Sequence, residues 1–204
     1  MTIKRMVDLA ISVPALILLI PIFLLIGIVI RLDSPGPVFF RQVRIGQGGE
    51  PFRIHKFRTM VLDAQTKGGA LTIGEDPRIT RIGKLLRKYK IDELPQLFDV
   101  VRGTMSLVGP RPEVPEYVAR YSDDQQKVLK LMPGITDPAS IKYRNESELL
   151  AKARDPECEY CERILPDKIK INLEYAENAG VLSDIGVILS TLKSLVRSNN
   201  DANH

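Results

Sequence analysis

The longest apolar stretch of the chain lies close to its first residue. Residues 9–30 contain no charged side chain, and a helix over them would be about 33 Å long at roughly 1.5 Å per residue, enough to cross a bilayer. Pro14 and Pro21 lie inside it, and a proline deep in a helix removes a hydrogen bond and kinks the axis. Because no small-residue cleavage site follows, we predict a membrane helix over residues 1–32 rather than a signal peptide.

Basic residues flank this stretch on both sides. Lys4 and Arg5 precede it, and Arg31, Arg41 and Arg44 follow it. The positive-inside rule therefore selects no orientation. A re-entrant helix that enters and leaves on one face satisfies this pattern, whereas a spanning helix places one basic cluster outside. The charge pattern leaves both arrangements open.

Beyond the membrane helix, apolar and polar residues alternate around a glycine pair. The alternation over residues 34–60, with Gly48-Gly49 at its centre, predicts a β-hairpin. Its second arm carries Lys56, Arg58 and Thr59. These side chains are therefore expected to project from one strand end.

A loop and two helices are predicted after the hairpin. Residues 62–77, rich in Gly, Thr and Asp, predict a mobile loop near the site, and residues 80–89 predict a basic helix. Asp92 is then the predicted N-cap of a further helix, with Pro95 tolerated in its first turn. The apolar positions with i, i+3, i+4, i+7 spacing on that helix are Leu94, Leu97, Phe98 and Val101.

Shorter patterns occupy the second half of the chain. Residues 114–121 and 169–177 predict helices, and residues 133–136 predict a turn. An apolar helical stripe over residues 185–196 usually packs in a core and could instead lie in a membrane interface. The polar tail, residues 198–204, is predicted to be disordered.

Composition limits the classes of partner without selecting one. The chain has 204 residues, 44% hydrophobic content, a net charge of +4 and a pI near 9.1, which suits a folded protein with anionic partners. Nucleic acid, phosphorylated metabolites and an anionic membrane surface all qualify. Because the chain has no tryptophan and few aromatic residues among its basic clusters, we predict that it binds no nucleic acid.

The chain has too few histidines and cysteines for a common metal site. The two histidines are His55 and His204, so Cys158 and Cys161 lack the partners of a four-ligand zinc site. We predict a structural His55 and reduced thiols. The motifs GxxxxGK[ST], GxGxxG, GxSxG and HExxH are also absent, which argues against P-loop NTPases, Rossmann oxidoreductases, serine hydrolases and zincins.

The remaining candidate chemistry lies at Asp92-Glu93 and at Arg111. A carboxylate at a helix N-terminus is kept ionised by unpaired N–H groups, so Asp92 could be a nucleophile or metal ligand, with a simple helix cap as the alternative. The prolines of Gly109-Pro110-Arg111-Pro112 exclude regular structure and fix the direction of Arg111. Carboxylates with cations suit phosphoryl or phosphosugar transfer with a divalent metal. The nearby cations are Lys84, Arg87, Lys88 and Lys90.

Longer motifs connect these residues. After the interrupted apolar stretch come PVFFRQVRIG, FRIHKFRTM, DELPQLFDVVRGTMSLVGPRP and PGIT, followed by an amphipathic C-terminus. With these motifs the chain resembles, over nearly its whole length, the small monotopic phosphoglycosyl transferases of bacterial glycan assembly, or bacterial sugar transferases. The resemblance implies an α+β, mostly helical, membrane-associated catalytic domain over residues 33–197. It also implies a re-entrant helix broken at Pro21, a small β-hairpin and amphipathic interfacial helices.

The resemblance also implies a reaction and roles. A phosphosugar would pass from a nucleotide diphosphate sugar, with uridine preferred, to polyprenyl (undecaprenyl) phosphate at the cytoplasmic face of the bacterial inner membrane. Asp92 would be the nucleophile and form a covalent phosphosugar intermediate. Glu93, with Asp92, would bind Mg²⁺. The positions implied to bind substrate are Arg111, Arg87, Arg58, Arg144, Lys56, Pro110 and Pro112.

The chain departs from the family pattern in three places. Ile20 precedes Pro21 where the family has a Ser-Pro pair. Residues 137–145 replace the common GWAQVNGRN, with Arg144 still matching, and the longer stretch 148–166 has no assigned function. The chain lacks the extra N-terminal membrane bundle of larger members, so we expect a minimal catalytic unit. Whether it forms a homodimer is left open.

Two rival hypotheses remain at this stage. A membrane-anchored binding module that recruits acidic partners through basic residues would need neither Asp92 nor Glu93. An aspartyl-phosphate hydrolase usually has a second aspartate two residues after the nucleophile, where this chain has Leu94.

Overall fold

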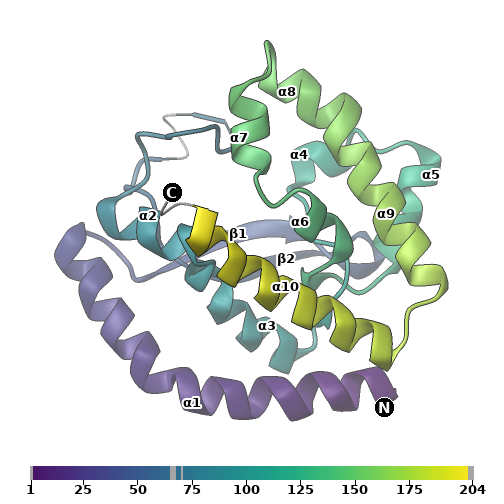
Figure 1. Cartoon of the computed structure of the whole chain (residues 1–204), viewed down its shortest axis with the longest axis horizontal. Coiled ribbons are helices and arrows are strands. Elements are labelled where there is room, and N and C mark those ends of the chain that lie inside the picture. Colours follow the sequence, from purple (N-terminus) through teal and green to yellow (C-terminus); the bar gives the residue numbers. More distant parts are fainter. Residues whose placement is uncertain (1, 65–67, 70, 202–204) are drawn as a thin grey trace.

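Two small sheets and many helices make up the computed structural model, which describes residues 2–64, 68, 69 and 71–201, with side chains as far as residue 195. Helix α1 (Ile3–Asp33) runs along one edge and bends, while α10 (Val181–Asp201) crosses the molecule (Figure 1). The α+β, mostly helical prediction is confirmed. Residues 198–201 of the predicted disordered tail are helical, and residues 202–204 lie outside the described residues.

The long helix α1 continues through both of its prolines. The helix continues without interruption through Pro14 and Pro21. The predicted break at Pro21 is therefore wrong, although the helix axis bends (Figure 1). A proline removes a single backbone hydrogen bond, and the bonds on either side keep the segment helical. The charge-free stretch therefore forms one curved apolar element.

The predicted hairpin is present. Strands β1 (Phe39–Ile45) and β2 (Pro51–Phe57) pair antiparallel, with Phe40 opposite Lys56. The connection, η1 (Gln47–Gly49), has positive φ at Gly48 and Gly49. Glycine reaches that conformation without steric cost, so this pair allows the chain to reverse.

The segment after the hairpin forms three short helices. They are α2 (Arg81–Lys88), the 3-10 helix η2 (Ile91–Gln96) and α3 (Leu97–Arg102). The prediction that Asp92 is the N-cap is wrong: the cap position is Lys90, which has left-handed φ of 56°, and no side chain caps the turn. Because the chain reverses at Lys90, the helix starts earlier and places Asp92 inside its first turn.

A second sheet replaces a predicted turn. Strand β4 (Gly134–Thr136) pairs parallel with β3 (Ser106–Val108), so the turn over residues 133–136 is wrong. A Cβ on Gly109 would collide with the carbonyl of Met132, and one on Gly134 would collide with the backbone of Gly109. The glycines of GPRP and PGIT thus allow these two backbone segments to lie very close together. A turn prediction does not anticipate this contact.

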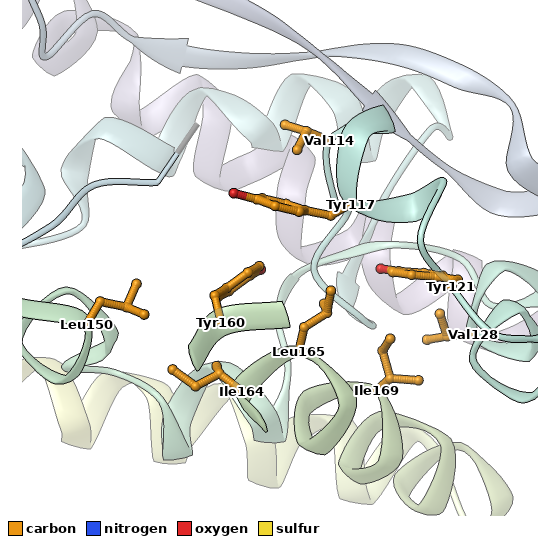
Figure 2. Packing of buried hydrophobic residues seen from close by; sticks show 9 residues of the cluster. All are labelled: Val114, Tyr117, Tyr121, Val128, Leu150, Tyr160, Ile164, Leu165 and Ile169. Atoms are coloured by element: carbon orange, nitrogen blue, oxygen red, sulfur yellow. The ribbon is translucent and has the colours of Figure 1, made fainter. Parts of the chain in front are cut away.

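The largest core cluster lies among the helices of the second half. Tyr117 and Tyr121 face Leu165 and Ile169 across it (Figure 2). The stretch 148–166 supplies several of its members, including the fully buried Ile164, which gives that stretch a structural role. The elements here are α4 (Pro115–Val118), α5 (Asp123–Gln126), η3 (Lys127–Lys130), α6 (Pro138–Lys142), α7 (Glu146–Ala151), α8 (Pro156–Glu159), the π-helical η4 (Tyr160–Ile164) and α9 (Leu165–Glu177).

Polar contacts join the first turns of α1 to the rest of the protein. Lys4 donates to the Val108 carbonyl at 3.0 Å, and Arg5 donates to the Val101 carbonyl at 2.9 Å at the end of α3. The buried Asp8 accepts from the Ser106 hydroxyl at 2.8 Å. This end of the apolar helix is therefore held against β3 and α3.

The apolar stripe of the last helix is largely exposed. Ile185, Leu189 and Leu192 are exposed, while Val187 is buried. Core packing, the usual arrangement for such a stripe, is therefore wrong for most of it. Helix α1 is similar: Leu16 and Phe23 are buried in a core cluster, whereas apolar side chains such as Leu18 and Leu24 are exposed. Two helices thus present uncovered apolar surface.

Candidate active site

The carboxylate of Glu93 is surrounded by cations. Arg111 donates to both of its oxygens, with Nη1 at 2.9 Å from Oε2, and Lys56 Nζ lies 2.8 Å from Oε1. Burial alone would raise the pKa of Glu93, but Arg111 and Lys56 lower it well below its ordinary value. Glu93 is thus an ionised anchor that joins β2 and the GPRP loop to η2.

Asp92 has the opposite surroundings. It is 7% exposed, and its Oδ1 is buried without a hydrogen-bond donor among the described residues. Burial raises the pKa of Asp92, and the neighbouring charge of Glu93 raises it further, against the opposing effects of Lys56, Lys90 and Arg87. The expectation of a capped aspartate is therefore wrong, and both burial and Glu93 oppose the ionised form that a helix cap would have favoured. What remains is a carboxylate oxygen without a partner, beside cations.

Lys56 and Arg111 respond differently to the same carboxylate. Burial lowers the pKa of Lys56 to about 8 in spite of Glu93. The charge of Glu93 raises the pKa of Arg111 above its ordinary value, which keeps the guanidinium protonated. Arg44 supports the loop, because its Nη1 donates to the Pro112 carbonyl at 3.0 Å. Pro110 and Pro112 themselves shape the backbone around Arg111.

Arg87 is held close to Asp92 by two threonines. Its Nε donates to Thr59 Oγ1 at 2.8 Å and its Nη1 to Thr72 Oγ1 at 3.0 Å. Burial lowers the pKa of Arg87, and Asp92 is the first of the charges that oppose this effect. The predicted loop over residues 62–77 therefore reaches the site through Thr72, although residues 65–67 and 70 lie outside the described residues. The two threonines were not among the predicted site residues.

Two other predicted arginines lie outside this cluster of contacts. Arg58 donates to the Ser34 carbonyl at 2.7 Å, to the Pro35 carbonyl and, at 3.4 Å, to the Ile30 carbonyl. It therefore binds the carbonyl end of α1. Arg144 follows α6 half-buried and forms no ion pair or hydrogen bond within the described part of the chain. Contacts thus join Glu93 to Lys56 and Arg111. Electrostatic effects link Asp92 to Glu93, Lys56 and Arg87, whereas Arg58 and Arg144 stay outside this group.

His55 has the structural role predicted for it. Its Nδ1 lies 2.7 Å from Asp99 Oδ1, and its backbone N–H donates to Asp99 Oδ2 at 2.9 Å. Because Asp99 is 1% exposed, the pair fixes β2 against α3 and thereby positions the neighbouring Lys56. Cys158 and Cys161 are free thiols. Among the described residues there is no cluster of three or more His, Cys, Asp or Glu suited to a metal.

A family model and several named relatives match the chain over most of its length. The family model described as bacterial sugar transferase matches residues 1–198. The chain is 36% identical over 197 residues to the UDP-N-acetylgalactosamine-undecaprenyl-phosphate N-acetylgalactosaminephosphotransferase of Aeromonas hydrophila, covering 95% of this chain and 44% of the relative. It is 35% identical over 209 residues to the UDP-glucose:undecaprenyl-phosphate glucose-1-phosphate transferase of Caulobacter vibrioides, covering 97% of this chain and 71% of that protein.

A third relative matches over almost the full length of both chains. It is the exopolysaccharide production protein PSS of Rhizobium leguminosarum, 36% identical over 210 residues, with 95% of each chain covered. The chain therefore spans between less than half and nearly all of these relatives. The family match over residues 1–198, together with these relatives, identifies the chain as a member of the bacterial sugar transferase family.

Proposed function

We propose that the chain is a phosphoglycosyl transferase that moves a phosphosugar from a UDP-sugar to undecaprenyl phosphate. The observation that carries the proposal is the contrast at η2, where a buried carboxylate oxygen of Asp92 has no donor while cations surround its neighbour. The names of the Aeromonas and Caulobacter relatives supply the donor and acceptor classes.

In the proposed first step, the free carboxylate oxygen of Asp92 attacks the sugar-linked phosphorus of the donor. A P–O bond to the aspartate forms, the P–O bond to the other phosphate breaks, and uridine monophosphate leaves with that electron pair. Arg87 and Arg111 would bind the diphosphate charge, a role supported by their location around the Asp92-Glu93 pair. A divalent cation bound together with the donor would favour the ionised form of Asp92, because a nearby positive charge lowers the pKa of a carboxyl group.

In the second step, a phosphate oxygen of undecaprenyl phosphate attacks the phosphorus of the aspartyl phosphosugar. The aspartyl P–O bond breaks, the carboxylate is regenerated, and the lipid carries a diphosphate-linked sugar. No proton is consumed overall. One small site can thus serve a soluble donor and a membrane-bound acceptor in turn.

The donor set is suited to Mg²⁺ when substrate is present. Magnesium is typically held by one or two carboxylates together with substrate phosphates and water. Asp92 offers an unpartnered buried oxygen, and Glu93 would contribute by exchanging one of its contacts with Lys56 or Arg111. The cation would offset diphosphate charge and assist departure of the nucleotide.

We further propose that α1 is a re-entrant helix at the cytoplasmic face of the bacterial inner membrane. It is long and apolar enough to enter a bilayer. Both of its ends contact the same domain, through Lys4 and Arg5 at one end and Arg58 at the other. A straight span would separate these ends by the bilayer thickness, whereas a bent helix keeps them on one side.

Two experiments test these proposals. The purified protein with Mg²⁺ and a UDP-sugar, but no lipid acceptor, should gain the mass of one phosphosugar and release uridine monophosphate, and undecaprenyl phosphate should then discharge it. Failure of mass transfer with every donor of a UDP-sugar panel would overturn the covalent route. For topology, Thr2→Cys and Arg41→Cys in a background without native cysteines should label from the same side. Labelling from opposite sides would show a spanning helix.

A further inference from the structure

Helix α9 carries two polar residues on a face that otherwise packs into the core. Leu165, Lys168, Ile169 and Asn172 follow i, i+3, i+4, i+7 spacing and therefore share one face. Leu165 and Ile169 extend from α9 toward Tyr121 and Val128 (Figure 2). Polar residues on such a face contradict the apolar pattern of a core helix, and departures of this kind concentrate at functional sites.

These polar residues line a pocket that also contains Arg111. Its walls come from the GPRP loop, the end of β1, α6 and α9, and its polar lining includes Arg111, Ser140, Lys168 and Asn172. The same Arg111 binds Glu93 beside Asp92. A donor whose diphosphate reaches Arg111 would therefore lie at the wall of this pocket.

Asn172 is the unexplained group in the pocket. It is 6% exposed, and its Oδ1 is buried with no hydrogen-bond donor among the described residues. Buried polar groups are usually hydrogen-bonded because an unsatisfied one destabilises the folded state. Its neighbour Lys168 already pairs with Glu146 and lies 5.3 Å from the centre of the Tyr160 ring. An acceptor kept without a partner beside a substrate-binding arginine indicates a ligand that donates to it.

We propose that Asn172 accepts a hydrogen bond from an amide or imide N–H of the sugar donor and is thus a specificity residue. The pocket holds about 40 Å³, room for a few water-sized groups, so the edge of a planar group enters it rather than a whole nucleoside. Two parts of a donor carry such an edge: the uracil imide and the N-acetyl group of an aminosugar. This inference deepens the function proposed above by assigning part of the donor to a pocket.

Equilibrium binding separates the two sources. With wild-type protein in lipid nanodiscs, affinities are measured for uridine monophosphate, UDP-glucose and UDP-N-acetylgalactosamine, and then for Asn172→Leu. A roughly tenfold loss for all three ligands assigns the uracil edge to Asn172, equivalent to about 1.4 kcal/mol. The same loss confined to UDP-N-acetylgalactosamine assigns the N-acetyl group. Unchanged affinity for all three overturns the proposal.

Stability measurements and control variants distinguish loss of the proposed contact from loss of the folded structure. Because leucine removes an unsatisfied buried acceptor, Asn172→Leu should leave the melting temperature unchanged or raise it, by about 2–4 °C. Asn172→Asp keeps an acceptor and should retain most of the affinity; loss equal to that of Asn172→Leu would contradict the acceptor role. Asn178→Leu, at the exposed end of α9, should bind as wild type. Since binding needs no turnover, this result stands apart from failure of the transfer reaction.

Discussion

Two adjacent residues of the 3-10 helix η2, Asp92 and Glu93, have opposite surroundings. On one side, Glu93 is held by Arg111 and Lys56, and its pKa is well below its ordinary value. On the other, Asp92 has an oxygen without a donor, and its pKa is raised by burial and by Glu93. Adjacent residues of like charge thus have different surroundings, and under the proposed function we expect different roles for them.

This difference has a physical consequence for stability. A buried ion pair is costly to break because the remaining charges lose their partner, which applies to Glu93. A buried carboxylate without partners gains little from its charge, which applies to Asp92. Function and stability should therefore separate between the two positions, and the variants below are ordered from the largest expected effect to the smallest.

Asp92→Asn should remove transfer activity by about 10⁴-fold or more, because the amide cannot act as the nucleophile of the proposed reaction. The same change removes a buried charge next to Glu93, so the free energy of unfolding should stay the same or increase. Release of uridine monophosphate and thermal unfolding measure the two effects. If the variant unfolds several degrees lower, Asp92 is a structural residue and the comparison fails.

Glu93→Gln should behave in the opposite way. Lys56 and Arg111 would lose their shared carboxylate in a buried setting, and breaking such a contact typically costs about 3–5 kcal/mol of stability. We expect a melting temperature lower by roughly 2–4 °C for each of these kcal/mol. Glu113→Gln is the comparison variant: its carboxylate lies 3.6 Å from Arg44 and accepts from the Tyr160 hydroxyl at 2.7 Å, a hydrogen bond that glutamine can keep. An equal loss in both variants would show that Glu93 is not distinctive.

Lys56→Arg tests the pH behaviour of the Glu93 side. The pKa of Lys56 is lowered to about 8, so Lys56 is charged below that pH and neutral above it. Activity that depends on this cation, measured as kcat/KM, should therefore fall as the pH rises past about 8, while the raised pKa of Asp92 produces an acidic limb. Arginine stays charged, so the alkaline limb should move to higher pH. An unchanged alkaline limb assigns it to another group.

The sequence predicted the parts of this site that local patterns encode. Alternation and the glycine pair predicted the hairpin that carries Lys56, and the prolines predicted an irregular loop around Arg111. The residues that usually mark a helix start led to the wrong prediction that Asp92 is the N-cap. The cap is Lys90, whose positive φ is set by how the chain reverses between α2 and η2. A left-handed lysine has no sequence signature, since glycine or asparagine is the usual residue there.

Long-range contacts were the part that patterns could not supply. Arg58 and Arg87 lie in similar basic segments, yet one binds the carbonyl end of α1 and the other two threonines beside Asp92. The parallel pairing of β3 with β4 likewise joins segments that are distant along the chain. Each of these depends on tertiary packing, which overrides local preference in short segments.

Thr59→Val should give the smallest effect and refine the Asp92 side of the comparison. Thr59 is buried, its hydroxyl accepts from Arg87 Nε at 2.8 Å, and valine keeps its shape without the acceptor. A hydrogen bond to a charged group is worth about 1.5–3 kcal/mol, and Thr72 still holds the other end of the guanidinium. We therefore expect kcat/KM to fall by about tenfold with a small change in melting temperature.

Thr72→Val should give a similar loss, and the double variant a larger one, because the two hydroxyls hold one side chain between them. If the double variant matches wild type in kcat/KM, the two threonine hydroxyls do not position Arg87 relative to Asp92. Packing around the Arg87 side chain would then be enough to hold it in place.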